Sequence, residues 1–119
     1  MAYVDGFVVP VATKNLKQYR KMAVLGGKLW KKHGALDYKE CVGDDLHPGF
    51  GLPFPKGIRA KPNETVFFSF IVYRSKADRV AVNKRVMKDP SMEIFMKKMP
   101  FDVKRMLCGG FKVLVDPFN

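Results

Sequence analysis

Residues 64–74 read Glu-Thr-Val-Phe-Phe-Ser-Phe-Ile-Val-Tyr-Arg, and this run of β-branched and aromatic side chains predicts a strand. Successive side chains of a strand point to opposite faces, so apolar groups fall on both faces of this one. A strand of that kind lies in the middle of a sheet and is covered on both sides. We therefore expect the neighbouring segments to supply its partner strands and the layers that cover it.

The segments around this strand alternate between strand and helix patterns. In chain order the predicted elements are a strand over 2–10, a helix over 15–33, strands over 35–43 and 64–74, a helix over 76–88, a short helix from 90 to about 98 and a strand over about 104–115. Ser75 and Asp78 form a capping box at the start of the second long helix. Asp89 caps the short helix, and Pro90 takes its first position. Residues 44–63 are rich in Pro and Gly, and we expect a long loop without regular structure there.

Apart from the short helix, the order is β-α-β-β-α-β, which is the ferredoxin-like pattern. It predicts an α+β fold with both helices on one face of a four-stranded antiparallel sheet and the first and third strands in its centre. We expect one ferredoxin-like domain over residues 1–119, because this length is within the usual size of a single domain. The other face of the sheet is bare and apolar, and a second copy packed face to face as a symmetric dimer would cover it.

Composition limits the partners and the location of the protein. Lys and Arg number 22 against 11 Asp and Glu, and the net charge of +11 favours anionic partners such as nucleic acid, a membrane surface or a small anionic ligand. No stretch is long and apolar enough to span a membrane, and no signal-peptide pattern opens the chain, so we expect a soluble cytoplasmic protein. Cys41 and Cys108 fall on the two predicted edge strands, too far apart for a disulfide, and are expected to be free thiols.

Charged residues near the last strand form the first candidate site. Asp102, Lys104 and Arg105 lead into this strand, and Asp5 lies on the adjacent first strand. In the functional interpretation, Lys104 and Arg105 hold an anionic group while Asp5 or Asp102 positions a proton or a hydroxyl. In the structural alternative, Asp102 caps a turn and pairs with Arg105, which fixes the last strand.

Glu40 is the second candidate. It lies on the predicted strand 35–43, where the alternation of side chains places it on the same face as Tyr38. Asp44 and Asp45 follow just after this strand. Carboxylates gathered at a strand end can form an acid/base site or a weak cation site, or they can simply form a turn.

The sequence contains no pattern typical of a metal or cofactor site and only part of a nucleic-acid-binding motif. His33 and His47 lack metal-ligand spacing to a cysteine, and no P-loop or dinucleotide fingerprint occurs, so we expect no metal and no cofactor. Residues 68–73 approximate part of the RNA-recognition consensus, but Val66-Phe67 stands where Lys/Arg-Gly is required. The lysines of the helix over 15–33 also face away from the sheet surface that binds RNA in such domains, so nucleic acid is a disfavoured partner.

Two stretches carry a resemblance to a known family. They are Tyr-Val-Asp-Gly-Phe-Val-Val-Pro at residues 3–10 and Met-Pro-Phe-Asp-Val-Lys-Arg-Met-Leu-Cys-Gly-Gly-Phe at 99–111. In them the chain resembles the YbaA-like family of uncharacterised small bacterial proteins, a domain of unknown function. The resemblance implies a fold of the dimeric α+β barrel superfamily and a homodimer formed through the open sheet faces. Val103 stands where glycine is usual in the family, and Cys108 where tyrosine is usual before the Gly-Gly pair.

Taken together, these observations predict a homodimer that binds a small molecule, anionic if the surplus of positive charge selects it. The residues predicted to bind it are Asp5, Glu40, Asp102, Lys104 and Arg105. The alternatives are a cofactor-independent monooxygenase-like or isomerase- or lyase-like enzyme, an RNA-binding protein, and a non-catalytic structural or regulatory dimer. The sequence does not decide whether the protein is an enzyme, and no catalytic residue is assigned from it.

Overall fold

The computed structural model of the chain describes residues 1–97 and 99–119. Its elements are, in order, β1 (Tyr3–Ala12), the 3₁₀ turn η1 (Thr13–Asn15), α1 (Leu16–Lys32), β2 (Asp37–Val42), α2 (Phe54–Gly57), β3 (Glu64–Tyr73), α3 (Lys76–Lys88), α4 (Ser91–Lys97), the 3₁₀ turn η2 (Val103–Arg105) and β4 (Leu107–Lys112).

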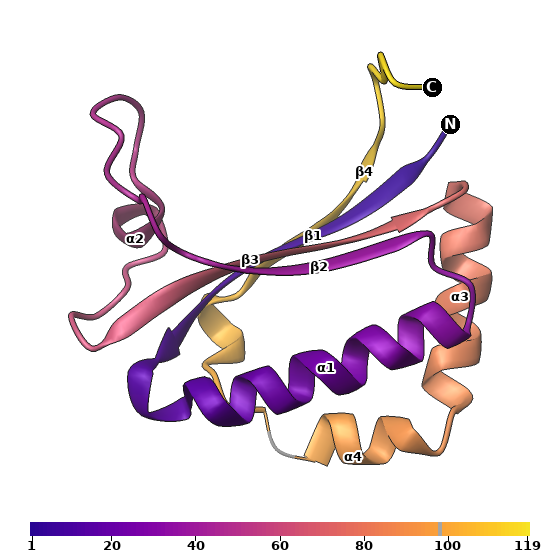
Figure 1. Cartoon of the computed structure of the whole chain (residues 1–119), viewed down its shortest axis with the longest axis horizontal. Helices are drawn as coiled ribbons and strands as arrows, with labels where there is room; N and C mark the ends of the chain where they lie inside the picture. The colour runs from indigo at the N-terminus through magenta and orange to yellow at the C-terminus, as the bar shows by residue number, and fades with distance from the viewer. Residues whose placement is uncertain (98) are drawn as a thin grey trace.

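The four strands form one antiparallel sheet in the order β2-β3-β1-β4. The central pair, β1 and β3, is in register from Tyr3 opposite Tyr73 to Ala12 opposite Glu64. Helices α1, α3 and α4 lie on one face of the sheet (Figure 1). This is the predicted ferredoxin-like α+β arrangement, with α4 as the additional helix before the last strand.

Helix boundaries follow the predicted capping residues. The Ser75 hydroxyl accepts a hydrogen bond from the backbone N–H of Asp78 at 3.0 Å, and the Asp89 carboxylate accepts one from the N–H of Ser91 at 2.9 Å. Gly34, which ends α1, has a φ of +112°, a conformation that glycine adopts without strain. Lys98, the predicted end of the short helix, lies outside the described residues.

Several boundaries differ from the prediction, since β1 continues to Ala12 instead of ending at residue 10 and β2 spans Asp37–Val42 instead of 35–43. The last strand is shorter than the predicted 104–115, because residues Val103–Arg105 form the turn η2. Within 44–63, where no regular structure was expected, Phe54–Gly57 form the single helical turn α2. Pro55 lies at the start of this turn, where a missing N–H costs nothing.

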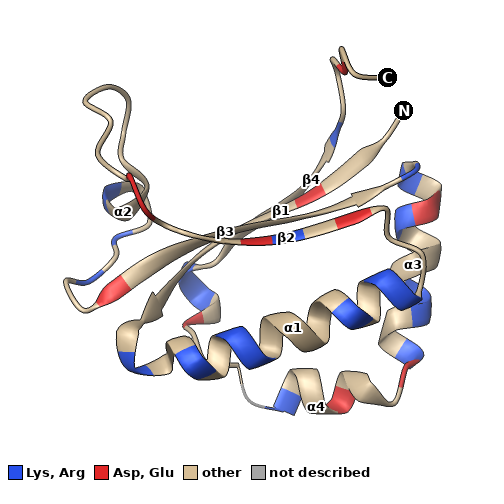
Figure 2. Ribbon diagram, in the orientation of Figure 1, with Lys and Arg blue, Asp and Glu red and all other residues tan. Residues whose placement is uncertain are grey.

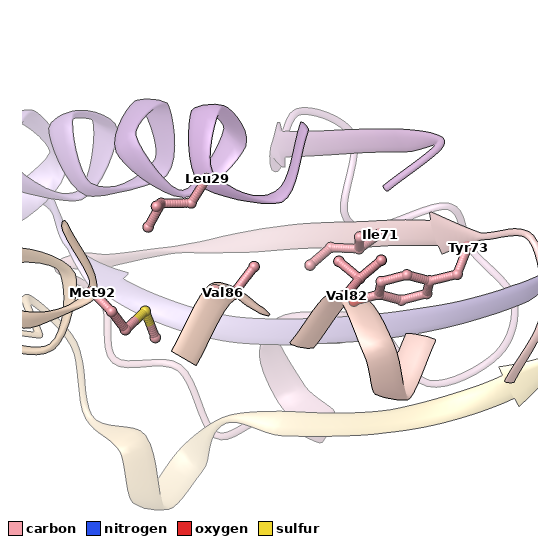
Figure 3. Close-up of a cluster of buried hydrophobic side chains, with 6 residues drawn as sticks. All are labelled: Leu29, Ile71, Tyr73, Val82, Val86 and Met92. Atoms are coloured by element: carbon pink, nitrogen blue, oxygen red, sulfur yellow. The ribbon is translucent and has the colours of Figure 1, made fainter. Parts of the chain in front are cut away.

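The main core lies between the sheet and the helices. Its buried side chains come from α1, β3, α3 and α4, and they are Leu29, Ile71, Tyr73, Val82, Val86 and Met92 (Figure 3). Val82 and Val86 are one helical turn apart, so they share the buried face of α3. This core joins the three helices to one face of the sheet.

The opposite face of the sheet is covered only in part. Ile58, which follows α2, packs on Val8 and Val66. The Phe54 ring of α2 also lies 6.4 Å from that of Phe68, yet the large apolar side chains of Phe68 and Phe111 remain 45% and 62% exposed. We call this surface the open face.

Lys and Arg lie on several elements, α3 among them, and recur along η1 and α1 (Figure 2). The lysines at positions 14, 17, 21, 28 and 32 are all exposed there, as the helical periodicity predicts. At the end of α1, Asp89 accepts hydrogen bonds from Lys32 at 3.0 Å and pairs with the His33 ring at 2.7 Å. These contacts, chiefly the one with His33, lower the pKa of Asp89. No helix of the described residues combines the length and the apolar character that crossing a membrane requires.

Candidate functional site

A cavity of about 210 Å³ lies between the sheet and the layer formed by α1, α4 and residues 99–106. Its walls are mainly apolar and include Phe7, Met22, Trp30, Ile71, Phe95 and Met106. The polar residues that line it are Tyr19, Tyr38, Glu40 and Ser69. An apolar cavity with a few polar groups on one side is the usual form of a small-molecule site.

Glu40 is held at the edge of this cavity by two tyrosines. The hydroxyl of Tyr19, on α1, donates a hydrogen bond to Glu40 Oε1 at 2.8 Å. The hydroxyl of Tyr38, two residues before Glu40 on β2, donates to Oε2 at 3.1 Å. The carboxyl group therefore has a fixed position and a fixed orientation, which a proton-transfer group requires.

The surroundings of Glu40 shift its acidity and that of both tyrosines. Burial raises the pKa of Glu40 above its ordinary value, and the hydrogen bonds from the two hydroxyls oppose this only in part. Burial, together with the charge of Glu40, raises the pKa of Tyr19 and Tyr38 as well. The tyrosines consequently stay protonated and act as donors, while Glu40 is the acidic group of the three and the one that can exchange a proton.

The Tyr38 hydroxyl has two acceptors within reach but only one hydrogen to donate. Besides Glu40 Oε2, the backbone carbonyl oxygen of Ala23 lies 3.3 Å from it. When Glu40 is protonated on Oε2, its new O–H can donate to the tyrosine oxygen while the tyrosine hydrogen turns to Ala23. Both protonation states of Glu40 are thus hydrogen-bonded, so neither carries the full cost of an unpaired buried polar group.

A pair of glycines in α1 makes room for Tyr38. A Cβ atom added at Gly26 would lie 2.7 Å from the Tyr38 hydroxyl oxygen and 3.0 Å from Phe95 Cε2, and one at Gly27 would lie 3.4 Å from the Tyr38 ring. Glycine inside a helix is about 1 kcal/mol less favourable than alanine. The helix tolerates this cost at Gly26 because any larger residue would push Tyr38 away from Glu40.

Ser69 lies directly opposite Glu40 in the register between β2 and β3. Its side chain is on the same face of the sheet and lines the cavity, and the residue is only 7% exposed. Among residues 1–97 and 99–119, the hydrogen bonds to Glu40 come from the two tyrosines, and no side-chain hydrogen bond of the Ser69 hydroxyl is found. A molecule in the cavity would therefore find a hydroxyl donor beside a carboxyl group.

The structure does not bring the first group of predicted residues together. Asp5 accepts two hydrogen bonds from Arg79, at 2.8 Å and 3.1 Å. Arg105 instead pairs with Glu64, which lies opposite Ala12 at the other end of β1. Asp5 and Ala12 are seven positions apart along β1, which is about 23 Å. The prediction that Asp5 and Arg105 share a pocket is therefore wrong.

The contacts of Asp102 and Arg105 match the structural alternative. Asp102 accepts hydrogen bonds from the backbone N–H of Lys104 and from Arg105 Nε, each at 3.0 Å. The two Nη groups of Arg105 bind the Glu64 carboxylate at 2.7 Å and 2.8 Å and lower the pKa of Glu64 to about 2. Lys104 is exposed. This cluster joins the start of β4 to the start of β3.

Glu40 is the one sequence-predicted residue that lines the cavity, and sequence reasoning missed its partners. The alternation along β2 already placed Tyr38 on the face of Glu40, and helical spacing placed Tyr19 on the buried side of α1. Ser69 had no signal beyond being a polar residue in an apolar strand. Asp44 and Asp45, predicted to accompany Glu40, are exposed and do not line the cavity.

Comparison with known proteins places the chain in a family. Residues 2–103 match the family described as "Protein of unknown function (DUF1428)". The "Uncharacterized protein YbaA" of Escherichia coli K12 is 45% identical over 116 residues, which cover 98% of this chain and 99% of that protein. The protein of the same name from Shigella flexneri matches equally well. The resemblance seen in the sequence is thereby confirmed.

Among solved structures, an uncharacterised NIPSNAP domain protein from Burkholderia xenovorans has a similar fold. Its TM-score is 0.58 at 14% sequence identity, with 98% of this chain and 97% of that chain covered. A likeness at this identity supports the α+β fold alone. With the family match over most of its length, the chain belongs to the DUF1428 family of unknown function.

Proposed function

We propose that the cavity binds a small, neutral carbonyl compound and that Glu40 transfers a proton to and from the carbon next to its carbonyl group. The observation that carries this proposal is the carboxyl group of Glu40, partly buried, oriented by two tyrosyl hydroxyls and facing an otherwise apolar cavity. Burial raises the pKa of this carboxyl group, which makes the carboxylate a stronger base than an exposed one.

The proposed step is redox-neutral and needs no co-reactant. Glu40 takes a proton from the carbon beside the carbonyl group, and the electron pair moves to the carbonyl oxygen. The free hydroxyl of Ser69 donates a hydrogen bond to that oxygen while negative charge develops on it. The proton then returns to the same carbon or to a neighbouring one, so the overall reaction is an exchange or an isomerisation.

The size and charge of the cavity define the ligand further. At about 210 Å³ it is smaller than the pockets that hold drug-sized ligands, so the molecule is small. Of the described residues that line it, none is Lys or Arg, while Glu40 is acidic. An anion would be repelled by ionised Glu40 without a compensating cation, and for this cavity a neutral ligand is therefore the better proposal.

The proposal is tested with cyclohexanone and acetophenone as neutral, mainly apolar probes. In D₂O, proton NMR follows the exchange of the hydrogens next to the carbonyl group, and thermal unfolding follows binding. We expect the wild-type protein to accelerate exchange. The exchange rate with the E40Q variant should be at least about 100-fold lower, because 100-fold is the lower end of what general base catalysis contributes. The E93Q variant, which changes an exposed glutamate of α4, is the matched control. Exchange by E40Q at the wild-type rate, or no stabilisation and no exchange with either probe, would overturn the proposal.

We also propose that two copies of the chain pack through the open face, as the family resemblance implies. Support comes from the exposed apolar side chains there, which include Phe68 and Phe111. Sedimentation velocity is expected to show a dimer for the wild type and for V80E, which alters the outer surface of α3, and a monomer for F68E. A monomeric wild type would contradict dimerisation, and would leave Phe68 and Phe70 accessible, as the RNA-binding alternative requires. Fluorescence anisotropy with a labelled single-stranded RNA would then test that alternative.

A further inference from the structure

A second cavity of about 350 Å³ lies on the helix-covered face of the sheet, between α3 and strands β1, β3 and β4. Phe7, Trp30 and Ile71 line both this cavity and the first one, so these three side chains form a wall between them. The second cavity is also lined by Arg79 and Asn83, which the proposed function does not use.

Arg79 is held in one orientation. Its Nε and Nη2 groups donate to the two carboxylate oxygens of Asp5, which is 6% exposed, and its guanidinium lies 5.3 Å from the centre of the Tyr3 ring. This leaves Nη1, which has no hydrogen-bond partner within the described part of the chain. Asp5 and Tyr3 therefore fix the guanidinium and leave one of its edges available to a ligand.

Asn83 lies four residues after Arg79, one turn further along the same side of α3. Its Oδ1 accepts hydrogen bonds from the indole N–H of Trp30 at 3.0 Å and from the Tyr73 hydroxyl at 3.3 Å. Because an indole N–H can only donate, the atom that faces it must be the amide oxygen. The amide nitrogen carries two donors, and neither is paired with any of the described residues.

We propose that this second cavity binds the carboxylate of a small molecule, with Arg79 and Asn83 as its hydrogen-bond donors. Both side chains offer N–H groups and no free acceptor, and a carboxylate offers only acceptors. The apolar part of the molecule would lie against Phe7 and Met87.

Asp5 already balances the charge of Arg79, but one guanidinium can hold two carboxylates. Arg105 does so in this same chain, since it binds Glu64 through both Nη groups and Asp102 through Nε. The net charge of +11 further favours an anionic ligand. The site uses neither Glu40 nor Ser69, so it stands or falls independently of the proposed proton transfer.

Trp30 gives a direct measurement of binding, because it is the only tryptophan of the chain and lines the cavity. We expect benzoate to change its fluorescence with a dissociation constant of about 1 mM or tighter, and the neutral benzamide to bind at least about 10-fold more weakly. The N83D variant keeps the acceptor for Trp30 but replaces the free amide donors by a charged oxygen. It should weaken benzoate binding by at least about 10-fold. N63D, which makes the same change at an exposed position, should not.

Cysteine protection tests the location with every predicted ligand-contacting residue intact. Cys108 lines the second cavity, whereas Cys41 is an exposed cysteine of β2 that does not. Saturating benzoate should slow the alkylation of Cys108 by iodoacetamide in the C41S variant and leave that of Cys41 unchanged in C108S. Three results would overturn the proposal: no fluorescence change up to about 10 mM benzoate, equal affinity of N83D and N63D, or equal alkylation of Cys108 with and without benzoate.

Discussion

Replacing each of the two α1 glycines by alanine should separate two contributions to stability, the packing around Tyr38 and the helix propensity of the glycine position. Both substitutions are in the same helix interior, and each gains about 1 kcal/mol of helix propensity relative to glycine. They differ in what the new methyl group meets. At Gly26 it meets the Tyr38 hydroxyl oxygen at 2.7 Å and Phe95 at 3.0 Å, whereas at Gly27 its nearest contacts are at 3.4 Å.

The expected magnitudes follow from these distances. G27A should leave the free energy of unfolding unchanged or raise it by up to about 1 kcal/mol. In G26A the same gain is opposed by overpacking of about 1–3 kcal/mol, so the net change is a loss of up to about 2 kcal/mol. The Tyr38 hydroxyl cannot simply swing away, because it is hydrogen-bonded to Glu40 and lies close to the Ala23 carbonyl.

Urea denaturation measures the two free energies, and the ¹³C chemical shift of the Glu40 carboxyl group across a pH titration measures its pKa. G26A should raise the pKa of Glu40, because the Tyr38 donor that lowers it is displaced. G27A should not change this pKa. In the Y38F background the penalty of G26A should shrink, since the nearest atom is gone. Equal stability of G26A and G27A, with the same Glu40 pKa in both, would refute the reasoning.

Two further predictions concern the last strand and its anchoring. A Cβ atom at Gly110 would lie 2.6 Å from the hydroxyl oxygen of the buried Tyr3 ring, so G110A should lose about 1–3 kcal/mol of stability in urea denaturation. G109A, whose methyl group would meet only ordinary contacts, should change it by less than about 0.5 kcal/mol, and equal losses in the two would contradict this account. The Arg105 hydrogen bonds lower the pKa of Glu64 from 4.5, its ordinary value in an unfolded chain, to about 2. The ionised carboxylate therefore stabilises the fold fully at a pH above 4.5, and this stabilisation is lost as the pH falls toward 2. The difference in unfolding free energy between wild type and E64Q should therefore shrink between about pH 5 and about pH 2, and a difference independent of pH would exclude the ion pair as its source.

Much of the fold could be predicted from the sequence because its determinants are local. Ser75 and Asp89 cap helices through atoms two or three residues away, and Gly34 ends α1 through its own backbone conformation. The position of β3 in the centre follows from its apolar character on both faces. The turn η2 was not predicted, because the sequence favours a continuous strand there and the contact that fixes Arg105 comes from Glu64, 41 residues away.

The candidate sites were harder to predict from the sequence because they depend on how the elements pack against one another. Glu40 could be selected as a polar residue on a strand, but its contact with Tyr19 depends on where α1 crosses β2. Asp5 was selected too, yet its partner Arg79 is 74 residues away and has no special feature in the sequence. Periodicity indicates which face a residue occupies, and it does not give the registry of one layer over another.

The wall between the two cavities has a consequence for thermodynamic linkage. It consists of single side chains, Phe7, Trp30 and Ile71, that contact one cavity on one side and the second on the other. A ligand that shifts any of these rings or branches to fit one cavity necessarily changes the volume left in the other. The resulting coupling free energy must be the same in both directions, so a carboxylate that alters the affinity for a carbonyl compound by some factor has its own affinity altered by that factor.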